Sequence, residues 1–304
     1  MGLFNWLKGN NVLYIPGCMA LKYKSGFETY QAIFNKLGIN FISLDDVGLN
    51  SICSGLEALE AGYDSEARKI VRRNSDLISQ NGFSSIITTS PGGYKMFLEN
   101  YPEILPNWDI EVKNIWGIIL DRLLKKHKLI KEKAMEFVTY HDNCYLGRYC
   151  GIYDEPRRIL ELIGYEIKEM DNSREDSFCC GSCGGLIFSN PDLANKIANE
   201  RILQAKRIGV KKLVVVGFEN YDLLKKNVGD SDIEILEFSD VLAQALGIKI
   251  FSKIEEEVIE GEDRVLNSRE VDESKVLTET KANMRLRDEL KEEDYYDEFE
   301  ESIF

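Results

Sequence analysis

The sequence lacks the segments that would place it in a membrane or send it out of the cell. No run of apolar residues approaches the roughly 18 that a transmembrane helix needs. The stretch from Met1 to Lys8 lacks the basic region, the apolar segment and the cleavage site that make up a secretory signal. Without such a signal, an odd number of cysteines, seven, disfavours a disulfide framework and favours metal or redox use. We therefore expect a cytoplasmic protein with reduced thiols.

Basic residues are also in short supply. The chain has 38 Lys and Arg against 52 Asp and Glu, which gives a net charge of −14. Nucleic-acid binding needs a surplus of positive charge to neutralise phosphates, so we expect no nucleic-acid partner. The sequence has no Walker A loop, no Gly-x-Gly-x-x-Gly and no Gly-x-Ser-x-Gly motif. Nucleotide binding and serine hydrolysis therefore have no support in the sequence.

Most of the acidic charge lies at the end of the chain. Residues 251–304 contain 19 Asp and Glu against 8 Lys and Arg, a net of −11, whereas the first 250 residues have a net of −3. Such a segment can be a solvated extension, or it can dock on a basic partner through its terminal aromatic residues. We predict that residues 248–304 form an acidic tail of one of these two kinds.

The cysteines show that the chain contains an internal repeat. Cys18 and Cys144 each end a short β-type run, and Cys53 and Cys179 each follow 35 residues later. Each half then continues with a helix, a strand and a glycine-containing loop. The helices are expected near 67–81 and 191–208, the strands at 83–89 and 212–216, and the loops at 90–94 and 217–221. The matched order predicts a duplicated fold.

Strands that alternate with helices of ten or more residues are typical of βαβ units and a mainly parallel sheet. We therefore predict an α/β protein with two duplicated domains, residues 10–133 and 134–247, related by a pseudo-twofold axis. Ligands of open α/β sheets gather at the carboxyl ends of the strands. The loops that carry Cys18, Cys53 and Ser90 should therefore meet at one site, and their counterparts in the second half at another.

The second half concentrates thiols. Its cysteines are Cys144, Cys150, Cys179, Cys180 and Cys183. Thiolates are soft ligands that suit iron–sulfur clusters and zinc. The glycines of segment 179–185 allow backbone N–H groups to approach the sulfur atoms of a cluster. One alternative is a zinc site, although only Cys180 and Cys183 have the Cys-x-x-Cys spacing typical of such a site. A second alternative is that the thiols are buried and inert.

The segment His141-Asp-Asn-Cys144-Tyr-Leu-Gly-Arg148, followed by Cys179-Cys180-Gly181, resembles the cysteine-rich CCG domain. The resemblance covers about residues 10–247. This domain occurs in the catalytic subunit of heterodisulfide reductase and in iron–sulfur subunits of anaerobic glycerol-3-phosphate, glycolate and lactate oxidoreductases. The resemblance implies a 4Fe–4S cluster, noncubane in heterodisulfide reductase. It also implies partners that are ferredoxin-like or flavoprotein redox subunits, in a complex that can be peripheral to a membrane.

The resemblance also assigns ligands. The candidates for metal and cofactor binding are Cys144, Cys179, Cys180 and Cys183. Of these, Cys144, Cys179 and Cys180 match the family motif, and Cys183 and Cys150 are possible substitutes for its missing thiols. The later Cys-x-x-Cys of the family is replaced by Ser90-Pro-Gly-Gly93 in the first half and by Gly217-Phe-Glu-Asn220 in the second. The first half keeps only Cys18 and Cys53, so we expect one cluster, held by the second half.

Two further residues lie beside this motif. His141 could donate a proton to a thiolate that leaves a cleaved disulfide, or it could make a structural hydrogen bond. Arg148 could offset the charge of a cluster, or it could form a surface ion pair. The sequence thus favours an iron–sulfur redox subunit that transfers electrons or reduces a disulfide. The alternative is a non-catalytic assembly or scaffold protein that keeps the duplicated fold.

Overall fold

The structure is a computed structural model that describes residues 12–47 and 52–249. The predicted acidic tail beyond Lys249 lies outside the described residues. None of the helices within the described ranges is long and apolar enough to cross a bilayer.

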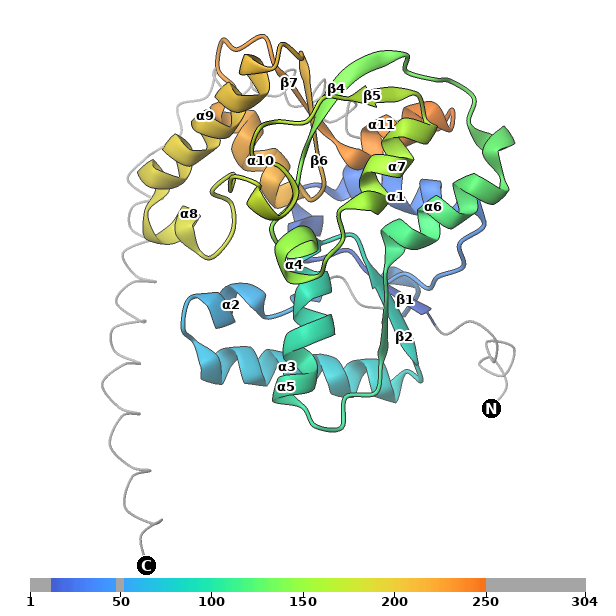
Figure 1. The fold of residues 1–304 in the computed structure, drawn as a ribbon. Helices are drawn as coiled ribbons and strands as arrows, with labels where there is room; N and C mark the ends of the chain where they lie inside the picture. The colour runs from blue at the N-terminus through green and yellow to red at the C-terminus, as the bar shows by residue number, and fades with distance from the viewer. Residues whose placement is uncertain (1–11, 48–51, 250–304) are drawn as a thin grey trace, which may run out of the picture. The chain divides into compact units, whose positions relative to one another are not determined.

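Two small parallel sheets organise the fold, one in each half (Figure 1). The first has the order β1-β2-β3 and the second the order β5-β4-β6-β7. The strands are β1 (Val12–Ile15), β2 (Ser85–Thr88), β3 (Glu111–Lys113), β4 (Glu136–His141), β5 (Tyr165–Ile167), β6 (Lys212–Val215) and β7 (Glu234–Glu237). A parallel bridge from Leu13 to Ile42 occupies the place of β5 beside β4, so the two sheets share one strand order.

The helices repeat in the same order. The long helices are α1 (Lys24–Leu37), α3 (Asp64–Gln80) and α6 (Ile115–Lys125) in the first half, and α7 (Asp154–Leu162), α9 (Pro191–Arg207), α10 (Phe218–Asn227) and α11 (Phe238–Ala245) in the second. Helices α3 and α9 each contain 17 residues. Where the second half has α10, the first has α4 (Pro91–Lys95), a π-helical turn at Met96–Asn100 and α5 (Tyr101–Ile104). The predicted duplication is confirmed.

Short helical elements carry the cysteine loops and connect the longer ones. They are the 3-10 turns Cys18–Leu21, Asp45–Val47, His127–Leu129 and Arg174–Asp176, the π-helical turn Tyr145–Tyr149, and the short helices α2 (Leu56–Glu60) and α8 (Leu186–Ser189). Helix α4, which follows the middle strand of the first sheet, has typical capping residues at its N-terminus. Ser90 Oγ accepts a hydrogen bond from Gly93 N at 3.2 Å, and Pro91 takes the first helical position.

One hydrophobic core includes both halves. Tyr14 and Trp116 of the first half belong to the same cluster of buried residues as Tyr140 and Phe238 of the second. Helix α1 packs against α11, and α6 packs against α7 (Figure 1). Each sheet lies within one of the predicted ranges, 10–133 and 134–247, but the limits of the two domains and their pseudo-twofold relation stay predictions.

Candidate functional site

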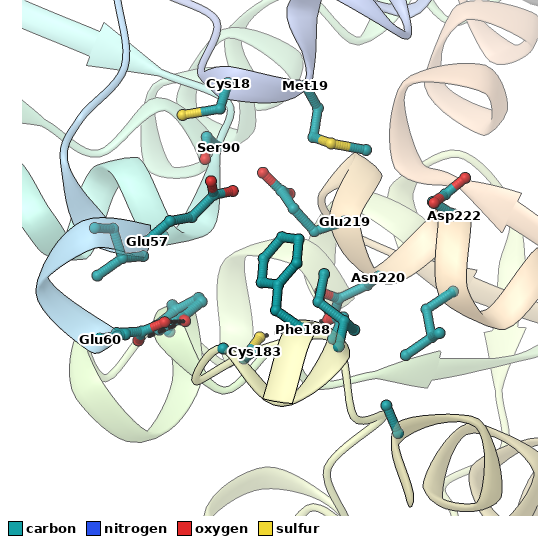
Figure 2. Close-up of a pocket in the computed structure, with 18 of the residues that line it drawn as sticks. Cys18, Met19, Glu57, Glu60, Ser90, Cys183, Phe188, Glu219, Asn220 and Asp222 are labelled. Carbon is teal, nitrogen blue, oxygen red and sulfur yellow. Dashed lines mark hydrogen bonds between the residues drawn. The ribbon is translucent and has the colours of Figure 1, made fainter. Parts of the chain in front are cut away.

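A cavity of about 500 Å³ opens where loops from both halves meet (Figure 2). Cys18 follows β1 and Ser90 follows β2, whereas Asn143 follows β4 and Glu219 follows β6. All four line the cavity, together with Cys183. The carboxyl ends of the strands thus bring the loops of both halves to one site, whereas the sequence predicted one site for each half.

The four candidate ligands of the second half lie together, and one of them, Cys183, lines this cavity. Hydrogen bonding with Cys179 and Cys183, together with burial, raises the pKa of the Cys144 thiol. Hydrogen bonding from Cys144 and Cys180 lowers the pKa of Cys179, and Gly181 N donates to Cys179 Sγ at 3.3 Å. Cys180 is only 1% exposed, and its sulfur lies 3.2 Å from Ser182 Oγ.

Cys150, the substitute ligand named by the sequence, has different surroundings. It follows the π-helical turn Tyr145–Tyr149 and packs partly buried against the shared core. Burial and the nearby Glu99 raise the pKa of its thiol to about 12, and Lys95 opposes this. Cys150 therefore lies near Lys95, the last residue of α4, and near Glu99 in the π-helical turn that follows α4.

Two arginines, one buried and one exposed, hydrogen-bond to the loop that leads to Cys179. Arg201 is fully buried, and it donates from Nη1 to Asn172 O at 2.9 Å and from Nη2 to Ser177 Oγ at 3.4 Å. Arg148 Nη1 donates to Ser177 O at 2.6 Å. Arg148 therefore binds a backbone carbonyl two residues before Cys179. The predicted role of Arg148 in offsetting the charge of a cluster stays a prediction.

A second buried arginine fixes the end of β4. Arg157 donates to both oxygens of Asp142, at 2.6 and 2.8 Å, and to Glu169. Asp142 Oδ2 also accepts a hydrogen bond from Arg174 N at 2.8 Å. Sequence reasoning missed Arg157 and Arg201, because nothing in their local sequence distinguishes them from arginines on a solvated helix face.

His141 is buried and accepts a hydrogen bond from Arg201 Nε at Nδ1, over 3.1 Å. Burial and the charge of Arg201 lower the pKa of the imidazole to about 3. A neutral ring that accepts at Nδ1 carries its proton on Nε2. This geometry matches the structural hydrogen bond that the sequence also allowed, and the role of His141 as a proton donor stays a prediction.

The segment that stands in place of the family's later Cys-x-x-Cys supplies an amide. Asn220 Oδ1 accepts from Ser182 Oγ at 2.9 Å and from Asn143 Nδ2 at 3.1 Å. Asn220 Nδ2 is buried and has no hydrogen-bond partner among the residues that the structure describes. Because Asn220 also lines the cavity, this amide is a donor available to a group bound there. Sequence reasoning gave Asn220 no role.

These donors suit an iron–sulfur cluster. Four clustered thiols match the ligand number of a 4Fe–4S cluster, and the N–H of Gly181 already points at a sulfur atom. The free amide of Asn220 and the nearby arginines would offset the negative charge of a cluster. In residues 12–47 and 52–249, no group of three or more His, Cys, Asp or Glu side chains is arranged to hold a single metal ion.

Comparison with known proteins identifies the repeat. The family described as "CCG: Cysteine-rich domain" matches residues 12–97 and 138–217. One of the subunits of dihydromethanophenazine:CoB–CoM heterodisulfide reductase from Methanosarcina acetivorans is 31% identical over 255 residues, which cover 79% of this chain and 60% of the relative.

Two further proteins are similar in sequence to part of this chain. The probable iron-sulfur-binding oxidoreductase FadF of Bacillus subtilis is 32% identical over 58% of this chain and 24% of its own length. One of the subunits of the fumarate reductase (CoM/CoB) of Methanothermobacter marburgensis is 28% identical over 66% of this chain and 40% of its own length. The chain thus spans 60% or less of each of these three relatives. With two matched repeats and homology to iron–sulfur oxidoreductase subunits, the chain belongs to the CCG cysteine-rich domain family.

Proposed function

We propose that the chain is an iron–sulfur subunit of a cytoplasmic redox complex related to heterodisulfide reductase. Cys144, Cys179, Cys180 and Cys183 would hold one 4Fe–4S cluster. The observation that supports this proposal is that Cys144 hydrogen-bonds with Cys179 and Cys183, which lie 35 or more positions later in the sequence, and that Cys183 lines the cavity between the halves. The ferredoxin-like or flavoprotein partners of the proposal rest on the family alone.

The chain's own residues would position and shield such a cluster. When bound, the cluster would supply single electrons to a molecule in the cavity or to a partner. Arg148 binds the backbone carbonyl of Ser177 and Arg201 binds its hydroxyl, and Asn220 Nδ2 would donate a hydrogen bond toward the bound group. The cavity of about 500 Å³ falls within the range of roughly 300–1,000 Å³ typical of small-molecule sites. A small disulfide would fit it.

Metal content tests this proposal. The full chain, purified without oxygen, should contain about four iron and four sulfide ions per molecule, and reduction by dithionite should change its EPR spectrum. A protein that folds but binds no iron under these conditions would contradict the proposal. That outcome would favour the scaffold alternative, which the loss of thiols from the first half already suggests.

A further inference from the structure

The first half contains a close pair of thiols that the proposed cluster does not use. Cys18 Sγ and Cys53 Sγ are 3.2 Å apart. Cys53 is exposed, whereas Cys18 is partly buried and lines the cavity (Figure 2). Two sulfur atoms at this separation need to approach by little more than 1 Å to form a disulfide, whose S–S bond is about 2.0 Å long.

Comparison of the two repeats shows which thiols the first half lacks. Cys18 precedes Cys144 by 126 residues, and Cys53 precedes Cys179 by the same number. At that offset, Ser54 stands for Cys180 and Glu57 stands for Cys183. The first half thus keeps two of four thiols, and the two that remain are in contact. Two thiols are too few for a Cys₄ cluster site, but they are sufficient for a dithiol that oxidises to a disulfide.

Buried hydrogen bonds hold the loop that presents Cys53. Asn74 Nδ2 donates to Cys53 O at 2.7 Å and to Tyr101 Oη at 2.8 Å, and Tyr101 Oη donates to Ser54 O at 3.2 Å. Asn74 and Tyr101 are both buried. On the other side, a Cβ atom on Gly17 would come within 2.6 Å of Ser90 Cβ, so Cys18 follows a tightly packed turn. Both thiols are therefore held in place by the fold.

The two thiols are not equivalent. The hydrogen bond from Cys18, and to a smaller degree the N–H of Gly55, lower the pKa of Cys53 to about 6, against burial and Glu57. The hydrogen bond to Cys53 and burial raise the pKa of Cys18. An exposed thiol with a depressed pKa beside a protonated, partly buried one is the arrangement of an attacking and a resolving cysteine.

We propose that Cys18 and Cys53 form a redox-active dithiol that exchanges with small-molecule disulfides. The Cys53 thiolate attacks one sulfur of the disulfide, its S–S bond breaks, and one thiolate leaves. Cys18 then loses its proton to that thiolate and attacks the Cys53 sulfur, which releases the second thiolate. The chain is oxidised to the Cys18–Cys53 disulfide, and the small disulfide is reduced to two thiols. Excess small thiol reverses both steps. This centre needs no cluster, so it stands independently of the proposed function.

The test is a redox titration of the full chain with glutathione as the probe. Protein is equilibrated without oxygen at stepped ratios of reduced to oxidised glutathione, quenched in acid, alkylated and analysed by peptide mass spectrometry. We expect Cys18 and Cys53 to lose reactivity together and to yield one linked peptide pair. Alkylation of both residues at every ratio would overturn the proposal, and so would independent reaction of the two.

Variants separate this centre from the cluster. Cys18→Ser should leave Cys53 trapped as a mixed disulfide with glutathione, whereas the control Cys150→Ser should leave the linked pair unchanged. Both Cys18→Ser and Cys53→Ser should keep the iron content of the wild type. If they lose iron, the pair ligates metal and the proposal is wrong. If the wild type binds no iron but forms the linked pair, the cluster proposal fails and the dithiol stands.

Discussion

Glu237 is a buried carboxyl group at the end of β7, and only 1% of it is exposed. It accepts hydrogen bonds from Tyr30 Oη at 3.0 Å, Ser239 N at 2.6 Å and Gly217 N at 3.3 Å. It therefore joins α1 of the first half to the loop before α10 and to the first turn of α11 in the second half. Burial, assisted by Asp240, raises the pKa of Glu237 to about 7, and the hydrogen bonds from Ser239 and Tyr30 oppose this rise.

This carboxyl should make stability depend on pH. Its pKa is higher in the folded than in the unfolded state, so the folded protein binds more protons between these values. The contribution to stability is complete below the unfolded pKa of about 4.3 and is lost as pH rises to about 7, by about 3 kcal/mol. Urea unfolding at pH 5 and pH 8 measures this change. Glu237→Gln should remove it, whereas the control Glu234→Gln, at an exposed position of β7, should retain it.

Arg157 should matter for stability more than an arginine on the surface. Arg157→Met would leave Asp142 buried without its ion pair, which typically costs about 3–5 kcal/mol. Arg207→Met is the matched control, since its ion pair with Glu200 is exposed and such pairs contribute about 0–1 kcal/mol. Urea unfolding of both variants makes the comparison. Equal losses would show that Asp142 is solvated when Arg157 is absent.

At the scale of single residues, the sequence predicted the thiols but not their supports. Cysteines in a glycine-rich segment are conspicuous, and their chemistry limits what they can do. Arg201 and His141 are 60 positions apart and meet only because α9 packs on β6, the neighbour of β4 in the sheet. The hydrogen bonds from Ser182 and Asn143 to Asn220 Oδ1, which leave the Asn220 amide nitrogen without a partner among the described residues, can be seen only in the folded structure. Contacts of this kind depend on tertiary structure, which spacing alone does not reveal.

At the scale of the element, the loop that carries Cys179 depends on a glycine. Gly181 has φ = +90°, and a Cβ atom there would lie 2.7 Å from Ala194 O in α9. Gly184, three residues later, has φ = +69° with nothing within 4 Å of a Cβ atom. The two positions share the left-handed backbone and differ in the space around it.

Gly181→Ala should therefore displace the loop from α9 and lower both stability and iron content. Gly184→Ala should incur only the backbone cost of a left-handed conformation, about 1–2 kcal/mol, and should keep its iron. Thermal unfolding and iron analysis of the two variants separate these effects. If both variants keep wild-type iron, the close packing of Gly181 against α9 does not position the thiols.

The order of strands and helices could be predicted from sequence because hydrophobic runs, glycines and prolines mark each unit. The segment at residues 40–43, Asn-Phe-Ile-Ser, is less regular than its sequence indicates. It reads as a strand, but only Ile42 pairs, through two backbone hydrogen bonds to β1. Strand β1 ends at Ile15, and Pro16 has no amide hydrogen to extend the pairing. The π-helical turns were not predicted, since they have no pattern of their own in sequence.

At the scale of the whole molecule, aromatic residues join the halves. Phe218, at the start of α10, stacks on Tyr23 with ring centroids 5.0 Å apart and lies 4.8 Å from Phe27. Gly26 makes room for it, because a Cβ atom there would come within 2.2 Å of the Phe218 ring. The helix α1 of the first half thus provides the pocket for a side chain of the second.

Phe218→Ala should destabilise both halves at once. Loss of a buried phenylalanine costs about 3–5 kcal/mol, and the shared core predicts that unfolding stays a single transition. Phe188→Ala is the control, since that ring is 70% exposed and its removal should change stability little. Circular dichroism and tryptophan fluorescence should report the same midpoint. Separate transitions for the two halves would contradict the shared core.

The most direct test of the proposed cluster compares iron in two variants at matching positions of the repeat. Cys179→Ser and Cys53→Ser are prepared without oxygen, and iron is measured per folded chain beside the wild type. We predict that Cys179→Ser loses most of its iron because only three of the proposed thiolate ligands remain, whereas Cys53→Ser retains it. Wild-type iron in Cys179→Ser, or equal loss from both variants, would contradict a cluster held by the second half alone.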